Sequence, residues 1–322
     1  MAPPIIPFNQ AIEATNGAPR ALLIGNGFSI RHFSYKTLLE KSGLDPGDPV
    51  RALFAALDTV DFERVIGALE HGSLVERTYK KEKRALALTA DADKLRRALV
   101  HAIRTIHPSN RDDLADVIPA CCSFLRKFGS IFTTNYDLLL NWVTLDDTQN
   151  FRDGFGLAQE ENGFLRPFKT EAYCNIYNLH GGLHLFQTAD GKLEKRLRET
   201  DGVIPAIGRT ITQGRRLPLY VAESTSFAKL ERIYASPYLR HCYETLKAAS
   251  GPFFVFGLSV DQKDAHIYEA LFQSDITHLY YCIHQPTAVL EEVAGELARF
   301  KERTGSEVDY SFVDSETANV WG

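Results

Sequence analysis

Short apolar runs alternate along the chain with longer stretches in which apolar residues recur every three or four positions. The short runs predict strands buried on both faces, as in a parallel sheet, and the spaced stretches predict amphipathic helices. Strands separated by helices favour an α/β fold with a doubly wound, mostly parallel, Rossmann-like sheet. The expected strands lie at residues 21–24, 131–132, 176–179, 217–222, 252–261, 277–283 and 308–313, the last of them as an edge strand.

One long region interrupts this alternation. Residues 36 to about 127 read mainly as helix and are too long for a single crossover, so we interpret them as a helical insertion. The insertion lies within one Rossmann-like domain that covers residues 20–322, after a loose N-terminal arm at 1–19. Residues 188–216 are polar and basic, and we expect them to form an exposed excursion. Helices are expected at 50–57, 62–69, 95–106, 227–233, 239–249, 267–272 and 288–303.

The amino-acid composition limits the cellular compartment and the classes of binding partner that we expect. The 322 residues are 44% hydrophobic and 24% charged, with a net charge of −5, which is ordinary for a globular protein and unfavourable for a dedicated nucleic-acid or anionic-membrane surface. No apolar run reaches the length of a transmembrane helix, and residues 1–7 lack the pattern of a signal peptide. Five cysteines without a Cys-x-x-Cys pair fit reduced thiols in the cytoplasm and argue against a four-cysteine zinc site.

Four of the expected strands end in glycine-rich or polar turns. Open α/β sheets bind ligands beyond the carboxyl ends of their strands, so we expect these turns to line one site. The first turn, Gly25-Asn26-Gly27, lets the backbone approach a phosphate closely, but Ile30 replaces the third glycine of the dehydrogenase fingerprint. A standard hydride-transfer site is therefore not expected. The candidate residues of the four turns are Gly25, Asn26, Gly27, Ser29, Thr134, Asn135, Asp137, His180, Gly257 and Ser259.

Each turn also has a purely structural interpretation. Asn135 or Asp137 suits the N-cap of a helix that the apolar run 138–140 would open. His180 suits either a general base near neutral pH or a core histidine bonded to a carbonyl. A Gly-x-Gly turn can equally connect a strand to a helix without any ligand. The four turns together favour a ligand site more strongly than any one of them alone.

The order of these motifs resembles that of the sirtuin (silent information regulator) superfamily. The series is a strand followed by Gly-x-Gly-x-Ser, then Thr-Asn-Tyr-Asp, Leu-His-Gly and Gly-x-Ser, and it spans residues 20 to about 272. The pieces at 134–137 and 179–181 look most like divergent bacterial sirtuin-like domains of antiviral defence, such as those of the Thoeris system, which hydrolyse NAD. The resemblance implies an NAD+ hydrolase that releases nicotinamide and ADP-ribose, with NAD as substrate and no metal.

The resemblance also implies roles for individual residues. Asn135 would hold the nicotinamide ribose or an attacking water, Asp137 would contact the nicotinamide carboxamide, and His180 would act as general base. The leaving group is already cationic, so the enzyme mainly has to stabilise an oxocarbenium-like centre and place a nucleophile. The remaining candidates would bind NAD: Gly25, Gly27 and Ser29 at the pyrophosphate, Gly257 and Ser259 beside the adenosine, and Asn26 and Thr134 as further contacts.

Departures from the superfamily point away from a protein deacylase. The four-cysteine zinc module of the deacylases is missing, and no second half for docking an acylated peptide is evident. A constantly active NAD hydrolase would kill its host. We therefore expect a homo-oligomer, or a separate trigger or ATPase partner, that restrains the activity.

Two other functions stay open. The same pocket can bind NAD or ADP-ribose as a sensor, without turnover. Alternatively, His180 with its two following glycines resembles the oxyanion motif of esterases, and Ser259 resembles the nucleophile of an α/β-hydrolase. Asp261 stands where that nucleophile motif has its last glycine, which counts against the hydrolase.

Two further patterns are interpreted as structural. The pattern Ser226-x-x-Lys229 matches penicillin-binding enzymes, but their companion motifs are absent, so we interpret it as a helix N-cap followed by a solvated lysine. His180 and His184 are four residues apart, as in some zinc sites, but two glycines between them argue against a shared helical face.

Overall fold

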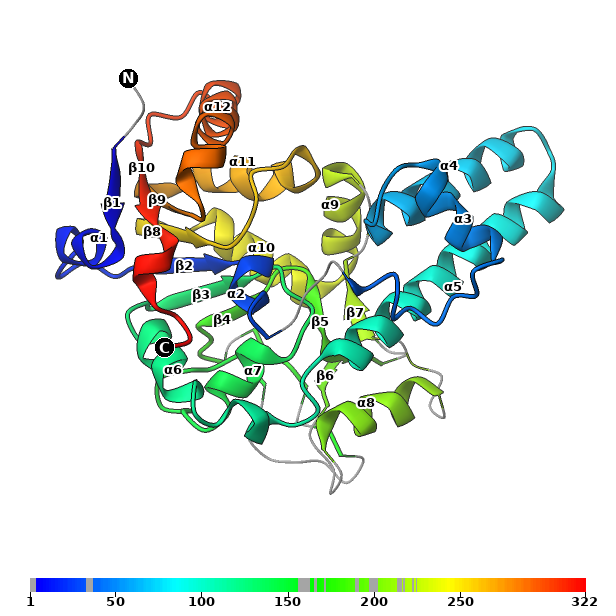
Figure 1. Ribbon diagram of the computed structural model, residues 1–322, viewed down its shortest axis with the longest axis horizontal. Coiled ribbons are helices and arrows are strands. Elements are labelled where there is room, and N and C mark those ends of the chain that lie inside the picture. The colour runs from blue at the N-terminus through cyan, green and yellow to red at the C-terminus, as the bar shows by residue number, and fades with distance from the viewer. Residues whose placement is uncertain are drawn as a thin grey trace.

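Seven parallel strands build the central sheet of the computed structural model (Figure 1). The strands are β1 (Ile5–Pro7), β2 (Ala21–Ile24), β3 (Ser130–Thr133), β4 (Ile176–Asn178), β8 (Ser250–Phe256), β9 (Asp275–Ile283) and β10 (Tyr310–Asp314). Their order across the sheet is β1-β10-β9-β8-β2-β3-β4. The structure describes residues 4–32, 37–155, 163–164, 167–170, 172–188, 191–196, 202–212, 216, 218–221, 223 and 225–322.

The strand order is that of a Rossmann fold. Without β1, the sheet runs third, second, first, fourth, fifth and sixth strand, and the order reverses between the neighbours β2 and β8. The predicted α/β, mostly parallel, doubly wound fold is therefore confirmed. Strand β2 shows why its sequence is apolar throughout, because Leu22 and Ile24 enter the core on one face while Ala21 and Leu23 enter the core on the other.

Helices cover both faces of the sheet. Phe8 and Phe124 pack into the core on the first face, and Tyr268 and Phe300 into the core on the second. The helices over the first face include α1 (Phe8–Ala14), α6 (Ile118–Leu125) and α7 (Leu139–Thr144). Those over the second include α10 (Pro237–Lys247), α11 (Ala265–Gln273) and α12 (Pro286–Thr304), while the short α2 (Asn26–Ser29) follows β2 and α9 (Ser226–Ala235) precedes α10.

The long segment between β2 and β3 is rich in helices. Helices α4 and α5 form a hairpin that projects to one side of the sheet (Figure 1). Within the hairpin, the Ser73 hydroxyl of α4 donates a hydrogen bond to the Ala85 carbonyl of α5 at 2.9 Å. None of the helices in the described part of the chain is long and apolar enough to cross a membrane. The helices of the segment before α6 are α3 (Pro49–Ala56), α4 (Phe62–Thr78), α5 (Glu82–Ile106) and the 3-10 helix η2 (Arg111–Leu114).

A second, three-stranded antiparallel sheet was not predicted. It consists of β5 (Gly181–Gln187), flanked by β6 (Leu193–Lys195) and β7 (Pro218–Tyr220), so the strand expected at 217–222 belongs here and not to the parallel sheet. Residues 217 and 222 themselves lie outside the described residues.

The prediction that residues 188–216 form an exposed excursion is wrong for the part that the structure describes. Leu193 of β6 is buried, and so is Ile207 of α8 (Val203–Thr212). Charged residues are frequent in the segment, but the apolar positions of α8 fall on one face of the helix and pack into the core.

Two predictions, the loose N-terminal arm at 1–19 and the edge strand at 308–313, are wrong for the same reason. Strand β1 pairs in parallel with β10, with Ile5 opposite Phe312, so β1 is the edge strand and β10 is internal. Phe8 anchors the segment through ring contacts with Phe124 and Phe254. A three-residue strand that ends in proline has no alternation of its own, so only its tertiary partners reveal it.

Candidate functional site

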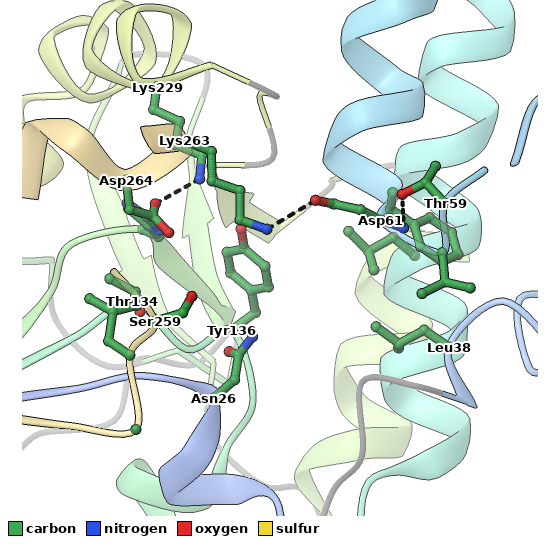
Figure 2. A pocket seen from close by; sticks show the side chains of 16 residues that line it. Asn26, Leu38, Thr59, Asp61, Thr134, Tyr136, Lys229, Ser259, Lys263 and Asp264 are labelled. Carbon is green, nitrogen blue, oxygen red and sulfur yellow. Dashed lines mark hydrogen bonds and ion pairs between the residues drawn. The ribbon is translucent and has the colours of Figure 1, made fainter. Parts of the chain in front are cut away.

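A cavity of about 410 Å³ lies beyond the carboxyl ends of β2 and β8, where the strand order reverses. The helical insertion supplies the opposite wall, with residues such as Leu38, Thr59 and Asp61 (Figure 2). All four predicted turns reach the cavity, so the expectation that they meet at one edge of the sheet is confirmed. Their contributions to its lining are Asn26, Thr134, Tyr136, His180, Gly257, Leu258 and Ser259.

The glycines of the first and last turns allow a close approach of two backbones. A Cβ atom added to Gly27 would lie 2.6 Å from the Cα of Gly257, and one added to Gly25 would lie 2.8 Å from the Gly257 carbonyl oxygen. The N–H of Gly27 donates to that carbonyl at 2.7 Å, and Gly257 has a φ of +68°. These glycines therefore have a packing role at the reversal point that does not depend on a phosphate ligand.

Consecutive residues of the turn after β3 face opposite ways. Thr134 and Tyr136 line the large cavity. Thr133, Asn135 and Asp137 instead line a separate void of about 10 Å³, which has room for about one water molecule. The sequence candidates 134–137 are thus divided between two different environments.

Asn135, Asp137 and Ser29 form a buried hydrogen-bond network behind the cavity wall. The Asn135 amide donates to the Gly25 carbonyl and to the Ser29 hydroxyl, both at 3.0 Å, and that hydroxyl donates to Asp137 Oδ2 at 2.6 Å. Asp137 Oδ1 accepts from the backbone N–H of Leu139 at 2.9 Å, where α7 begins. Asn135 Oδ1 is buried without a hydrogen-bond partner among the described residues. The network ties the turn after β2 to the turn after β3.

His180 is a buried, neutral histidine in the cavity wall. Its Nε2 lies 3.2 Å from Nε2 of His266, whose Nδ1 lies 3.1 Å from the hydroxyl of Ser226. Burial, and then the nearby Lys229 ammonium, lower the pKa of His180 well below its usual value. Burial also lowers the pKa of His266, to about 4. Both imidazoles are therefore uncharged at neutral pH.

A buried ion pair lies next to the two histidines. The Lys229 ammonium is 2.8 Å from Asp264 Oδ1, and Lys229 is only 1% exposed, so the prediction of a solvated lysine is wrong (Figure 2). The N-cap of α9 is Thr225, whose hydroxyl accepts from the N–H of Ala228 at 3.2 Å, and Ser226 is the first residue of the helix. Burial acts to raise the pKa of Asp264, but the Lys229 charge, the hydrogen bond from Lys229 and the two neighbouring histidines together hold that pKa below its ordinary value.

Over residues 22–321, the sequence matches a family model described as "Domain of unknown function (DUF4917)". The chain belongs to the DUF4917 family. The match begins within β2 and runs almost to the last residue, so the helical insertion and the antiparallel sheet are parts of the DUF4917 domain. No curated protein matches the chain.

In this DUF4917 chain, His180, Asp264 and His266 each place one possible metal-ligand atom within 4.8 Å of the others. Imidazole and carboxylate are ligands that Zn²⁺ accepts. The set fits a divalent cation poorly, however, because Lys229 already neutralises Asp264 and the two imidazoles are within hydrogen-bond distance of each other. We interpret the cluster as a hydrogen-bond network of the protein itself.

Sequence reasoning missed several groups of the DUF4917 cavity. Lys263 of η3 (Gln262–Asp264) lies 3.0 Å from Asp61 Oδ2, so an ion pair connects the edge of the sheet to the helical insertion (Figure 2). A usable signal was present, because Lys263, Asp264 and His266 follow closely on the turn at Ser259. Polar residues just after a strand at the reversal point are expected to face the ligand crevice.

Proposed function

We propose that this protein hydrolyses NAD+ to nicotinamide and ADP-ribose. The observation that carries the proposal is a buried, neutral histidine, His180, in the wall of a cavity at the reversal point of a Rossmann-ordered sheet. Dinucleotides bind at that point in this fold. The volume of about 410 Å³ falls in the range of small-molecule sites.

Two lysines line the cavity, and each is paired with an aspartate that also lines it: Lys229 with Asp264, and Lys263 with Asp61 on the side where the helical insertion closes the cavity. The diphosphate of NAD therefore has to compete with these aspartates for the lysines. Asn26, Ser259 and Thr134 add polar groups at the strand ends. We assign these three to contacts with the diphosphate and the ribose groups, and Gly257 to the adenosine side.

The remaining candidates support the cavity from behind. Gly25 and Gly27 hold the first turn against Gly257, while Ser29 joins that turn to Asp137. Asn135 and Asp137 face the small void, so their proposed contacts with the nicotinamide end require the 134–137 turn to move when NAD binds. The unpartnered Asn135 Oδ1 is the atom that we assign to the attacking water or the ribose.

The chemistry needs a base more than an acid. Water attacks C1′ of the nicotinamide ribose as the bond to the ring nitrogen breaks, and neutral nicotinamide leaves with the electron pair of that bond. The proton lost by the water passes to His180. A histidine kept neutral by burial is in the required state at neutral pH.

An α/β-hydrolase with Ser259 as nucleophile is disfavoured. In that fold the nucleophile occupies a sharp, strained turn. Here the left-handed residue at the end of β8 is Gly257, and Ser259 does not have a positive φ. His180 is paired with His266, and no hydrogen bond joins it to Ser259 among the described residues.

We further propose that the activity serves bacterial antiphage defence in the cytoplasm and is restrained by assembly. Exposed apolar side chains on the α4–α5 hairpin, Leu74, Val75, Tyr79 and Leu86, support a homo-oligomer or a separate trigger or ATPase partner. Sedimentation of the purified protein tests the first option, and a monomer with full activity on NAD alone contradicts both.

The test is release of nicotinamide from NAD+ by purified protein, measured by chromatography. His180→Ala should lower the rate by about 100-fold or more, since general bases contribute about 10²–10⁴-fold. His278→Ala, a matched control on β9 outside the cavity, should leave the rate unchanged. Release that survives in His180→Ala would refute the assignment. Binding of NAD without any release, measured by calorimetry, would favour the sensor.

A further inference from the structure

The two buried histidines and Ser226 form one hydrogen-bonded chain that leads away from the cavity. His180 lines the cavity and is 2% exposed, and His266 behind it is fully buried. Ser226, at the start of α9, is half-buried and reaches the solvent side. The Ser226 hydroxyl oxygen also accepts from the backbone N–H of His266 at 2.8 Å. The Ser226 hydroxyl thus contacts both the backbone N–H and the imidazole ring of His266.

The hydrogen bonds between Ser226 and His266 and between His266 and His180 couple the tautomers of the two histidines. In a neutral imidazole one nitrogen carries hydrogen and the other accepts, and the partner of one nitrogen decides the state of the other. If His266 carries its hydrogen on Nδ1 and donates to Ser226, its Nε2 must accept, and His180 must donate from Nε2. If Ser226 donates instead, both histidines take the opposite tautomer.

Only the first arrangement leaves His180 with a lone pair for the cavity. Its Nε2 is turned to His266, and Nδ1 has no hydrogen-bond partner among the described residues. The serine can support this arrangement, because its oxygen has two lone pairs for the two N–H groups of His266. Its own hydrogen can then point towards solvent, since Ser226 is half-buried.

We propose that His266 and Ser226 are positioning residues that hold His180 in the Nε2–H tautomer, with the Nδ1 lone pair available to the cavity. This rests on the proposed function for its catalytic consequence, but the tautomer itself is a property of the ligand-free protein. The arrangement follows the logic of hydrolytic triads, in which a third group fixes the tautomer of the base.

The first experiment reads the tautomers directly, by two-bond ¹H–¹⁵N correlation spectra of protein labelled at histidine. The wild type should show hydrogen on Nε2 of His180 and on Nδ1 of His266. Ser226→Ala should move both hydrogens to the opposite nitrogens, because His266 Nδ1–H loses its acceptor. Ser226→Thr keeps a hydroxyl and should keep the wild-type pattern. Hydrogen on Nδ1 of His180 in the wild type, or no change in Ser226→Ala, overturns the proposal.

The second experiment asks whether the tautomer matters for catalysis. His266→Leu removes the acceptor of the Nε2 hydrogen of His180, so kcat should fall about tenfold or more while KM changes by less than about twofold. His266→Gln can accept that hydrogen through its side-chain oxygen and should recover part of the rate. Equal kcat in the Leu and Gln variants contradicts the proposal. If wild-type protein hydrolyses no NAD, the proposed function fails, and the spectra still decide the tautomer.

Discussion

Removal of the Lys229 ammonium should destabilise the protein strongly and in a pH-dependent way. The Lys229 and Asp264 side chains are 2% and 8% exposed, with 2.8 Å between Nζ and Oδ1. At an effective dielectric constant of about 20, two unit charges at that distance attract by about 6 kcal/mol. Lys229→Met forfeits this attraction but also saves the cost of burying the ammonium, and breaking such pairs typically costs about 3–5 kcal/mol.

Protonation of Asp264 sets a ceiling on this loss. A carboxyl with an ordinary pKa near 3.9 can be kept neutral at pH 7 at a cost of about 4 kcal/mol, from about 1.4 kcal/mol per pH unit. We therefore expect Lys229→Met to lose about 3–4 kcal/mol at pH 7. The loss should shrink by up to about 1.4 kcal/mol for each pH unit down to pH 5, because the neutral carboxyl needs no partner.

Urea unfolding of wild type and variant at pH 7, 6 and 5 measures both effects. Lys301→Met is the matched control, since its ion pair with Asp309 has a similar length of 2.9 Å but lies at the surface. It should change stability little, because water screens exposed pairs. A Lys229→Met loss below about 1 kcal/mol, or one that does not vary with pH, would refute the picture of a buried, charged pair.

Three further outcomes follow from the same structure. Gly257→Ala should lower the free energy of unfolding by about 2–4 kcal/mol in the same urea assay, because Gly257 has a positive φ and an added Cβ would collide with the backbone of Gly27. The control Gly295→Ala in α12, with open space around it, should be neutral or stabilising. The free energy of unfolding should also fall as the pH drops from about 6.5 towards 4, by about 1.4 kcal/mol per pH unit for His266 alone. The reason is that the imidazole of His266 becomes protonated in the unfolded chain but stays neutral while it is buried. A flat pH profile of stability in that range contradicts the burial of this imidazole. Asp61→Asn should speed amide hydrogen exchange at the start of α4 by weakening the contact with Lys263, and unchanged exchange there would show that the ion pair does not hold the insertion.

The parallel sheet could be predicted because most of its strands are short apolar runs that are recognisable in the local sequence. Leu22 to Ile24 face two cores at once, so each of these positions is apolar and the run stands out. Strand β1 gave no such signal, since its three residues acquire strand geometry only by pairing with β10. The antiparallel sheet was equally hidden, because β5 contains two glycines and its partners lie within polar surroundings.

The edge of the sheet that carries the cavity could also be predicted, but not which side chains face it. Lys229 looked solvated because nothing near it in sequence offers a buried charge, and its partner Asp264 is 35 residues away. The sequence assigns no role to His266, which directly precedes the helix expected at 267–272, although it lies against His180 across 86 residues. Charge pairs and histidine contacts of this kind depend on the tertiary fold, which periodicity does not report.

In the turn after β3, alternate side chains face the large cavity and the small void, and this affects how activity data on variants must be interpreted. Asn135 holds the Gly25 carbonyl and the Ser29 hydroxyl, so Asn135→Ala disturbs the turn that shapes the cavity as well as any contact with the substrate. A loss of activity in that variant therefore reports the geometry of the turn as readily as the chemistry. His180 faces the cavity directly, and its protein partner is another side chain, not the backbone of a strand end. A rate lost in His180→Ala with NAD affinity retained consequently assigns the chemical step, and only then does a matching loss in Asn135→Ala identify a second residue of the reaction.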